Sequence, residues 1–350
     1  MTKPVSVAVF GVGVFGSNHL RVYRELEEAG EPLRIAAIVD ADPATPERIR
    51  HRYRAGGPAP QSTPPVYSSV EECLDARRTG RLHFDAASIC VPTSAHYALA
   101  SRALSEGLDV LLEKPIASTL EEADGLVRQA NEADRILQIG HVERFNPAVS
   151  AVMPLLNGPM FFESHRLSVF TPRALDVDVV LDLMIHDLDV VLSFAGSPVS
   201  EVRATGLPIL SPKVDIANVR LEFASGAVAN FTASRVSTEQ VRKLRFFQPH
   251  QYVSIDYARR DVLVINVAAA AGRAPDLSTA ARAGLSFHKP AVTDGEPLQL
   301  EIRDFLDCVR SRRSPRVTAA AGRHALALAL EINREIAAHA ERAGLRRFNA

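Results

Sequence analysis

Residues 5–20 read VSVAVFGVGVFGSNHL, and this stretch decides the fold. It begins with a short apolar run that is typical of a buried β-strand and too short to span a membrane. Gly11, Gly13 and Gly16 follow in the spacing G-x-G-x-x-G, and a helix is expected through Leu26. In a dinucleotide-binding loop the first glycine makes the tight turn, the second admits the pyrophosphate and the third lets the helix pack on the strand. The N–H groups and the dipole at the start of the helix would then attract the phosphates.

The next apolar run ends where a bound dinucleotide needs an acidic residue. Residues 33–39 read LRIAAIV and are followed by Asp40, 24 residues after Gly16. A carboxylate at this place bonds the ribose hydroxyls of NAD and repels the additional phosphate of NADP, so we expect NAD as the cofactor. The alternative is a glycine turn followed by an unrelated acidic residue at a strand end.

The composition is that of an ordinary globular protein, and 350 residues are enough for two domains. Hydrophobic residues make up 47% and charged residues 23%, and the formal net charge of -1 argues against general attraction to nucleic acid or anionic membranes. No leader or membrane-spanning segment is expected, so the cytoplasm is the predicted compartment. Cys73, Cys90 and Cys308 follow no disulfide or zinc spacing, and no metal site is predicted.

Residues 1–140 alternate between predicted strands and helices. The strands are expected at 5–10, 33–39, 84–91, 108–112 and 135–139. The helices are expected at 16–26, 69–78, 94–106 (with Ser94 as its cap) and 120–132. Such alternation indicates a parallel sheet with helices on both faces. We therefore predict an α/β fold with an N-terminal, doubly wound Rossmann domain at 1–140.

The pattern changes after Gly140. Strands are expected at 160–169, 199–204, 216–223, 227–234, 241–247, 252–256 and 262–267, and short turns between them indicate an antiparallel sheet. Residues 268–283 are rich in Ala and Gly and are predicted as a loop, and the helices are expected at 177–195, 298–312 and 318–343. Residues 141–350 are therefore predicted to form a second domain of different architecture.

In a doubly wound sheet, ligands bind beyond the carboxyl ends of the strands. Pro92-Thr93, Glu113-Lys114-Pro115 and Gly140-His141 lie at such ends. Lys114 is the most informative residue, because the chain has 35 Arg but only 5 Lys and only a lysine can give up its proton when desolvated. The alternative is a surface lysine beside a turn proline. His96, near the start of the following helix, either contacts the cofactor or supports the loop.

The predicted helix at 177–195 carries the second set of polar residues. Asp178, Asp182, His186 and Asp189 fall on one stripe of an otherwise apolar helix, which indicates the wall of a polar cleft or, alternatively, a solvated face. His186 can exchange a proton near neutral pH, and Asp182 one turn earlier can orient it. The alternative for His186 is a structural histidine bonded to a backbone carbonyl.

Three motifs resemble those of the glucose–fructose oxidoreductase/inositol dehydrogenase/rhizopine-catabolism (Gfo/Idh/MocA) family. They are Gly11-x-Gly13-x-x-Gly16-x-x-His19, Glu113-Lys114-Pro115 and Asp182-x-x-x-His186. The resemblance covers essentially the whole chain. It implies that the second domain, of the family's C-terminal type at 141–350, has a large, open, mostly antiparallel sheet that binds substrate and joins subunits into a dimer or tetramer.

The resemblance also implies where the chemistry takes place. It implies that Lys114 lies between nicotinamide and substrate, that Asp182 and His186 lie opposite, and that the Lys114–Pro115 bond is cis. The implied catalytic residues are Lys114, His186 and Asp182. The implied cofactor-binding residues are Gly11, Gly13, Val14, Phe15, Gly16, Asp40, Pro92, Thr93, His96, Glu113 and Lys114.

Four further peptides are similar to those of bacterial UDP-N-acetylglucosamine 3-dehydrogenases: GHVERFNP (140–147), FTPR (170–173), DVDVV (176–180) and MIHD (184–187). Enzymes of that group oxidise the sugar 3-hydroxyl to a ketone, which an aminotransferase converts to the 3-amino sugar of amide-linked lipid A. Alternatives within the family are another sugar or cyclitol substrate, such as UDP-N-acetylglucosaminuronate or myo-inositol. An alternative from another class is a non-catalytic, nucleotide-sensing regulator.

Such an oxidation removes the hydroxyl proton while hydride moves from the same carbon to the nicotinamide. Lys114 and His186 supply a base and a hydrogen-bond partner, and the sequence does not assign which is which. The two phosphates of a UDP-sugar need arginine forks or backbone N–H groups, and the candidates are Arg144, Arg166 and Arg173. Asn146 either bonds the substrate or caps the following helix.

Overall fold

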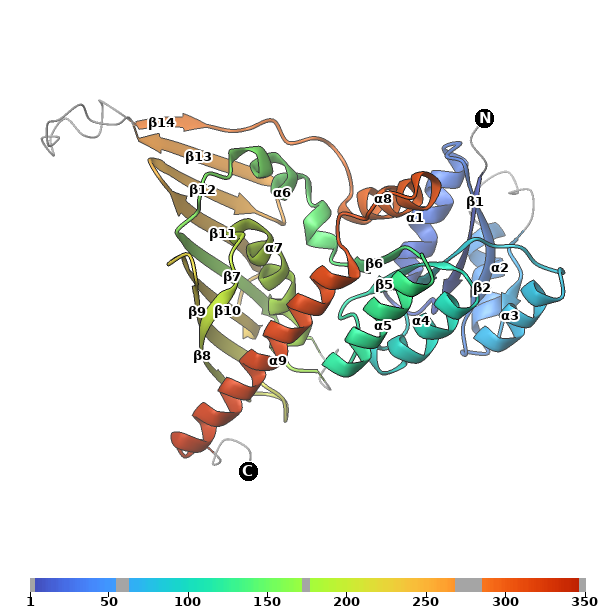
Figure 1. Cartoon of the computed structure of the whole chain (residues 1–350), viewed down its shortest axis with the longest axis horizontal. Helices are drawn as coiled ribbons and strands as arrows, with labels where there is room; N and C mark the ends of the chain where they lie inside the picture. Colours follow the sequence, from blue (N-terminus) through green and yellow to red (C-terminus); the bar gives the residue numbers. More distant parts are fainter. Residues whose placement is uncertain (1–3, 55–62, 172–176, 268–284, 346–350) are drawn as a thin grey trace, which may run out of the picture. The chain divides into compact units, whose positions relative to one another are not determined.

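The computed structural model describes residues 4–54, 63–171, 177–267 and 285–345 (Figure 1). The chain divides into two compact units, Met1–His141 with Leu298–Arg323, and Val142–Pro297 with His324–Ala350. The predicted boundaries, 1–140 and 141–350, differ from this division at residues 298–323, which belong with the first unit. The reason is local packing: Ile139 N–H donates to Val317 O (3.2 Å), and the Gln138 side chain donates to Glu301 O (3.2 Å).

The described part of the first unit contains a six-stranded sheet in the order β3-β2-β1-β4-β5-β6, and every strand pair in it is parallel. Its strands are β1 (Val5–Phe10), β2 (Leu33–Val39), β3 (Val66–Tyr67), β4 (Ala86–Ile89), β5 (Asp109–Glu113) and β6 (Leu137–Gly140). Its helices are α1 (Gly16–Glu28), α2 (Thr45–Arg54), α3 (Val70–Arg78), α4 (His96–Ser105), α5 (Leu120–Glu132) and α8 (Pro297–Ser311). This is the predicted doubly wound Rossmann sheet.

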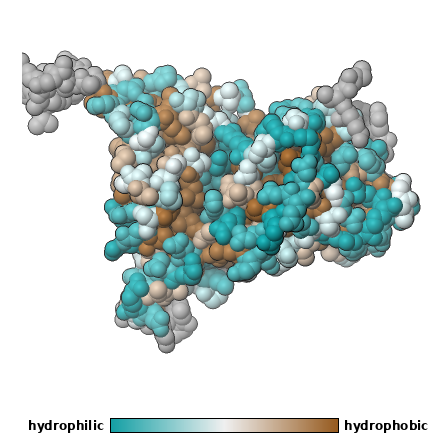
Figure 2. Space-filling model, viewed as in Figure 1, coloured by the Kyte–Doolittle hydropathy of each residue, from teal (hydrophilic) through white to brown (hydrophobic). Residues whose placement is uncertain are grey.

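Side-chain caps begin some of the helices in the first unit. Thr119 and Glu122 form a reciprocal capping box at the start of α5. The predicted cap at Ser94 is wrong, because residues 93–95 form a 3₁₀ turn and α4 begins at His96 without a side-chain cap among the described residues. Figure 2 shows hydrophilic residues over the outward surface of α5, whose Ala123, Leu126 and Ala130 are buried.

The second unit is built on an eight-stranded sheet, counted over its described residues, in the order β14-β13-β12-β11-β7-β10-β9-β8. All neighbours are antiparallel except β7 and β10, which run parallel. The strands are β7 (Phe161–Val169), β8 (Val199–Leu207), β9 (Ile216–Phe223), β10 (Val228–Ser237), β11 (Val241–Gln248), β12 (Gln251–Asp256), β13 (Asp261–Val267) and β14 (Leu285–His288). The prediction of a large, mostly antiparallel sheet is confirmed.

Helices cover one face of this sheet (Figure 1). They are α6 (Pro147–Val152), α7 (Ile185–Ala195) and α9 (Ala319–Arg342), and their apolar residues share one core with alternate residues of the strands. On β9, for example, Ala217, Val219, Leu221 and Phe223 are buried, while Asn218 and Arg220 are exposed on the other face. The sheet therefore has one packed and one open face.

One strand of the second unit, β14, was not predicted. The strand β14 is exposed along its whole length and so lacks the apolar alternation that marks a half-buried strand. The predicted loop at 268–283 lies outside the described residues. None of the helices in the described part of the chain combines the length and the hydrophobicity that crossing a lipid bilayer requires.

Candidate active site

The glycine loop between β1 and α1 has the shape that a dinucleotide phosphate requires. Gly11 has a φ of +84°, and a Cβ on it would lie 2.9 Å from Cys90 O. A Cβ on Gly16 would lie 1.9 Å from Gly11 O, so the start of α1 packs directly against the loop. At Gly13, by contrast, no described atom lies within 4 Å of the Cβ position. The fold therefore needs Gly11 and Gly16, whereas Gly13 leaves open space for a ligand.

The N-terminus of α1 can also bind an anion. Its N-cap residue is Phe15, and no side chain among the described residues caps it. Val14 and Phe15 are 72% and 41% exposed, which is unusual for large apolar side chains and leaves them available to a ligand. Backbone N–H groups at such a helix end bind phosphate well.

Asp40 lies at the carboxyl end of β2 and is fixed by the glycine loop. Its Oδ2 accepts a hydrogen bond from Val12 N–H at 2.7 Å, and its Oδ1 accepts one from Asp42 N–H at 2.9 Å. A carboxylate offers about four acceptor positions, so acceptor capacity remains for two ribose hydroxyls. The position and chemistry fit the predicted ribose contact.

His96 joins the two loops that carry Pro92 and Lys114. Its Nδ1 lies 2.8 Å from Pro115 O, and its Nε2 lies 2.9 Å from Val91 O. The ring is 1% exposed, and burial lowers the pKa of His96. Of the two predicted roles, these hydrogen bonds fit support of the loops. Thr93 lies in the turn before α4, half-exposed at the same edge of the sheet as Asp40.

Glu113 and Lys114 end β5 at this edge as well. Glu113 is buried, Lys114 is half-buried, and the Lys114–Pro115 bond is cis, as the resemblance implied. Glu113 Oε1 lies 2.9 Å from His19 Nε2. His19 was quoted only as part of the glycine motif, so the sequence reasoning missed its contact with Glu113.

The predicted helix at 177–195 is not a uniform α-helix. A π-helical segment, η4 (Val180–Met184), precedes α7. Asp182 lies in η4 and His186 in the first turn of α7, and both side chains are half-buried. Single π-helical turns inside helices occur frequently at functional sites, because they reposition the side chains that they carry.

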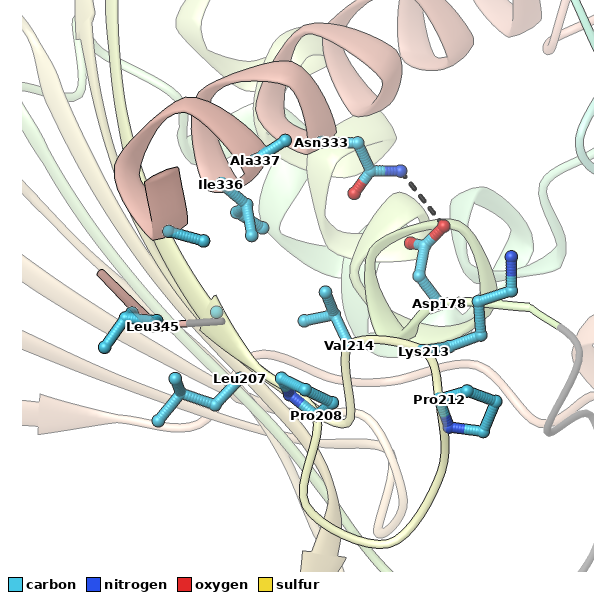
Figure 3. Close-up of a pocket in the computed structure, with 12 residues that line it drawn as sticks. Asp178, Leu207, Pro208, Pro212, Lys213, Val214, Asn333, Ile336, Ala337 and Leu345 are labelled. Atoms are coloured by element: carbon cyan, nitrogen blue, oxygen red, sulfur yellow. Dashed lines mark hydrogen bonds between the residues drawn. The ribbon is translucent and has the colours of Figure 1, made fainter. Parts of the chain in front are cut away.

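Asp178, one turn before Asp182, is engaged in hydrogen bonds of its own. Its Oδ1 accepts hydrogen bonds from Val180 N–H and Leu181 N–H at 2.9 Å each, so it caps the helix. Its Oδ2 accepts a bond from the Asn333 side chain of α9 at 3.0 Å, at one end of a pocket of about 310 Å³ (Figure 3). The remaining lining of that pocket is mostly apolar: Leu207, Pro208, Val214, Ile336 and Ala337. Asp178 therefore has a structural role.

Arg166, predicted as a phosphate ligand, is buried and paired with two carboxylates. It is 3% exposed, its Nε and Nη2 donate to Asp187 at 2.7 and 2.9 Å, and its Nη1 and Nη2 donate to Glu143 at 3.1 and 3.2 Å. Burial works against the charge, but Asp187 and Glu143 outweigh it and raise the pKa of Arg166. Since the guanidinium is paired with two buried carboxylates, its position fits a structural role better than the predicted phosphate role. Neither carboxylate was singled out from the sequence.

The other predicted substrate ligands have mixed outcomes. Asn146 Oδ1 accepts a bond from Ala148 N–H at 3.1 Å, and its Nδ2 donates to Glu143 and to Tyr257 O at 3.1 Å each. The capping alternative is thus what the structure shows. Arg144 Nη1 lies 3.3 Å from Asp189, which is 2% exposed. Arg173 lies outside the described residues.

Comparison with known proteins shows what family this architecture represents. The sequence model for the oxidoreductase family with an NAD-binding Rossmann fold (GFO_IDH_MocA) matches residues 5–141, and the GFO/IDH/MocA C-terminal domain matches residues 157–248. A UDP-N-acetylglucosamine 3-dehydrogenase of Acidithiobacillus ferrooxidans is 32% identical over 335 residues, covering 95% of this chain and 98% of that protein.

Its solved structure superposes with a TM-score of 0.81 at 31% identity, again over 95% of this chain and 98% of the other. A scyllo-inositol 2-dehydrogenase (NAD(+)) of Bacillus subtilis is 27% identical over 264 residues, covering 67% of this chain and 70% of that protein. The chain therefore belongs to the Gfo/Idh/MocA family of oxidoreductases, and its cofactor is NAD.

Proposed function

We propose that this protein oxidises the 3-hydroxyl of UDP-N-acetylglucosamine to the 3-keto sugar, with NAD⁺ as the oxidant. The observation that carries the proposal is the end-to-end match to the Acidithiobacillus enzyme, which includes the substrate-domain half of the chain. The inositol dehydrogenase of Bacillus subtilis matches only about two thirds of the chain, at lower identity. The product would supply an aminotransferase that makes the 3-amino sugar of lipid A.

The residues of this chain have separable roles in the proposal. When bound, NAD⁺ supplies the acceptor for the hydride. Gly13 and the N-terminus of α1 bind the pyrophosphate, and Asp40 binds the ribose. Lys114 and His186 act on the same hydroxyl, one as the base that takes its proton and the other as a hydrogen-bond donor. Asp182 orients His186.

The phosphates of the UDP group need donors that are not already committed. We do not assign this role to Arg166, because its guanidinium is already paired with two buried carboxylates. Arg144 and Arg173 remain the proposed ligands. Arg144 is only partly engaged by Asp189, at 3.3 Å, and can turn a second edge of its planar guanidinium to a phosphate.

We also infer that the open face of the second sheet joins subunits into a cytoplasmic homo-oligomer. Phe161, Phe247 and Tyr252 form an aromatic row across three strands, with ring centroids 5.8 and 5.1 Å apart. Phe247 is 41% exposed, and Phe287 on β14 is 68% exposed. A surface that presents so many large apolar groups is typical of an interface.

The proposal is tested by following NADH absorbance with a panel of alcohols. UDP-N-acetylglucosamine should give a kcat/KM at least tenfold above UDP-N-acetylglucosaminuronate and myo-inositol. Replacing NAD⁺ with NADP⁺ should lower the rate, because Asp40 repels the additional phosphate. Turnover of myo-inositol with none of the UDP-sugar would reject the substrate, and turnover of no alcohol would favour the regulator.

A further inference from the structure

Three ionisable side chains meet inside the first unit. His19 of α1, Glu113 of β5 and Glu301 of α8 are 0%, 8% and 0% exposed, and their nitrogen and oxygen atoms lie within 4.8 Å of one another. We call them the His19 cluster. Burying two carboxylates and an imidazole together is costly unless they neutralise one another, so the arrangement requires an explanation.

Both ring nitrogens of His19 have partners. Nδ1 lies 3.0 Å from Ser88 Oγ, and Nε2 lies 2.9 Å from Glu113 Oε1. Burial alone lowers the pKa of His19, but the neighbouring Cys90 and Glu113 outweigh burial and raise it well above its ordinary value. These neighbours favour the charged imidazolium, in which each ring nitrogen can donate a hydrogen bond to its partner.

The Glu113 carboxylate is fixed from two further sides. Its Oε2 accepts a bond from Lys114 N–H at 3.3 Å. A Cβ on Gly140 would lie 2.7 Å from Glu113 Oε1, so the carboxylate occupies space that only a glycine on β6 leaves. The carboxylate is thus held between α1, β6 and the first peptide of the Lys114 loop.

We propose that the His19 cluster is a positioning unit that fixes Lys114 relative to the phosphate-binding helix. His19 lies one turn into α1, three residues after Gly16, and Glu113 directly precedes Lys114 in the chain. The contact between them therefore ties the helix that receives the cofactor phosphates to the loop that presents the lysine. The inference rests on the proposed role of Lys114, and neither His19 nor Glu113 takes part in the chemistry itself.

A bound metal ion is the competing explanation, because one imidazole and two carboxylates are metal ligands. The two accounts differ at His19, since a metal needs a lone pair on the nitrogen where we place a proton. Elemental analysis separates them. One zinc, manganese or iron per purified chain that disappears in His19→Gln would overturn the positioning account.

The positioning role is tested with a pair of matched glycine variants. Gly140→Ala pushes a methyl group against the Glu113 carboxylate, whereas Gly322→Ala pushes one against Ile139, the preceding residue of the same strand, also at 2.7 Å. Gly140→Ala and His19→Gln should each lower kcat at least tenfold and change the Kd of NAD⁺ less than threefold. The double variant should be no worse than the poorer single one. Gly322→Ala should keep kcat within twofold of the parent.

A second readout needs no substrate, because the chain has only five lysines. Amine-reactive labelling of the NAD⁺-loaded protein, followed by peptide mass spectrometry, reports each lysine separately. In His19→Gln and Gly140→Ala, labelling of Lys114 should rise at least threefold while that of Lys213, Lys243 and Lys289 stays constant. The proposal is overturned if labelling of Lys114 in these two variants does not change. It is also overturned if their kcat falls only in proportion to their Tm, to the same extent as in Gly322→Ala. If the UDP-sugar is not a substrate but labelling behaves as expected, only the proposed reaction fails.

Discussion

In each of the two units a basic side chain is buried beside two carboxylates, and the two basic groups differ in how readily they lose a proton. The members are His19, Glu113 and Glu301 in the first unit and Arg166, Glu143 and Asp187 in the second. An arginine keeps its charge at any pH that the fold survives, whereas a histidine can lose its charge. We therefore expect the second cluster to keep its strength across the pH range and the first to weaken as the pH rises.

The difference also appears in what each cluster holds. Arg166 joins β7 to α7 and to the segment before α6, and its Cζ lies 5.3 Å from the centroid of the Tyr257 ring. All of these elements belong to the core of the second unit. His19 instead joins α1 to the peptide of Lys114, so its cluster lies next to residues that we assign to the reaction. We expect the first cluster to affect kcat and the second to affect stability.

The largest expected effect is the loss of stability when the arginine of the second cluster is replaced. Arg166→Met leaves two buried carboxylates without their cation and should lower the free energy of unfolding by about 3–5 kcal/mol. Urea denaturation measures it. Arg220→Met on β9 is the control, because Arg220 is 45% exposed and only 3.7 Å from Glu222, and it should change stability by less than about 0.5 kcal/mol. Equal effects of the two variants would remove the distinction between the buried and the exposed pair.

The next effect is on catalysis beside the first cluster. Lys114→Ala should lower kcat by about 100-fold or more, the usual loss when a general acid–base group is removed, while the Kd of NAD⁺ changes less than threefold. Steady-state kinetics and cofactor titration measure the two quantities. Lys213→Ala, on an exposed loop of the second unit, should leave both unchanged. Near-normal turnover by Lys114→Ala would show that the first cluster positions a residue without a role in the reaction.

The smallest effect is the pH dependence of stability. Because the pKa of His19 is raised on folding, its stabilisation is complete below the unfolded value of 6.5 and is lost as the pH rises through the folded value. His19→Gln should flatten this decline in the free energy of unfolding above pH 6.5. For His96, whose pKa is lowered, the stabilisation is present above pH 6.5 and lost as the pH falls. A His19→Gln profile that still declines above pH 6.5 like that of the parent would contradict the charged state of His19.

The two clusters also show which contacts of the site could be predicted from the sequence. The glycine loop, Asp40 and the end of β5 could be predicted, since each role follows from a few neighbouring residues in a strand–turn–helix pattern. Arg166 was predicted to bind phosphate because arginine forks suit phosphates, and its actual partners Glu143 and Asp187 lie 23 and 21 residues away in the sequence. Glu301 reaches His19 only because residues 298–323 fold back onto the first unit. Pairings over such distances depend on the tertiary fold and leave no local signal.

The same reasoning explains which elements of the fold could be predicted. Strands with continuous or alternating apolar residues, such as β1 and β9, could be predicted within a residue or two. The exposed strand β14 could not be predicted, because only its hydrogen bonds to β13 define it. The π-helical turn η4 was predicted as ordinary helix, since its sequence is as apolar and regular as that of α7.

The central claim is that this chain moves hydride from C3 of a UDP-sugar to NAD⁺, and isotope transfer tests it most directly. UDP-N-acetylglucosamine carrying deuterium at C3 would be incubated with the protein and NAD⁺, and the NADH would be examined by mass spectrometry and NMR. The account predicts one deuterium at C4 of the nicotinamide and a UDP-3-keto sugar that has lost it. NADH without deuterium, or a sugar that keeps its C3 label, would contradict the account.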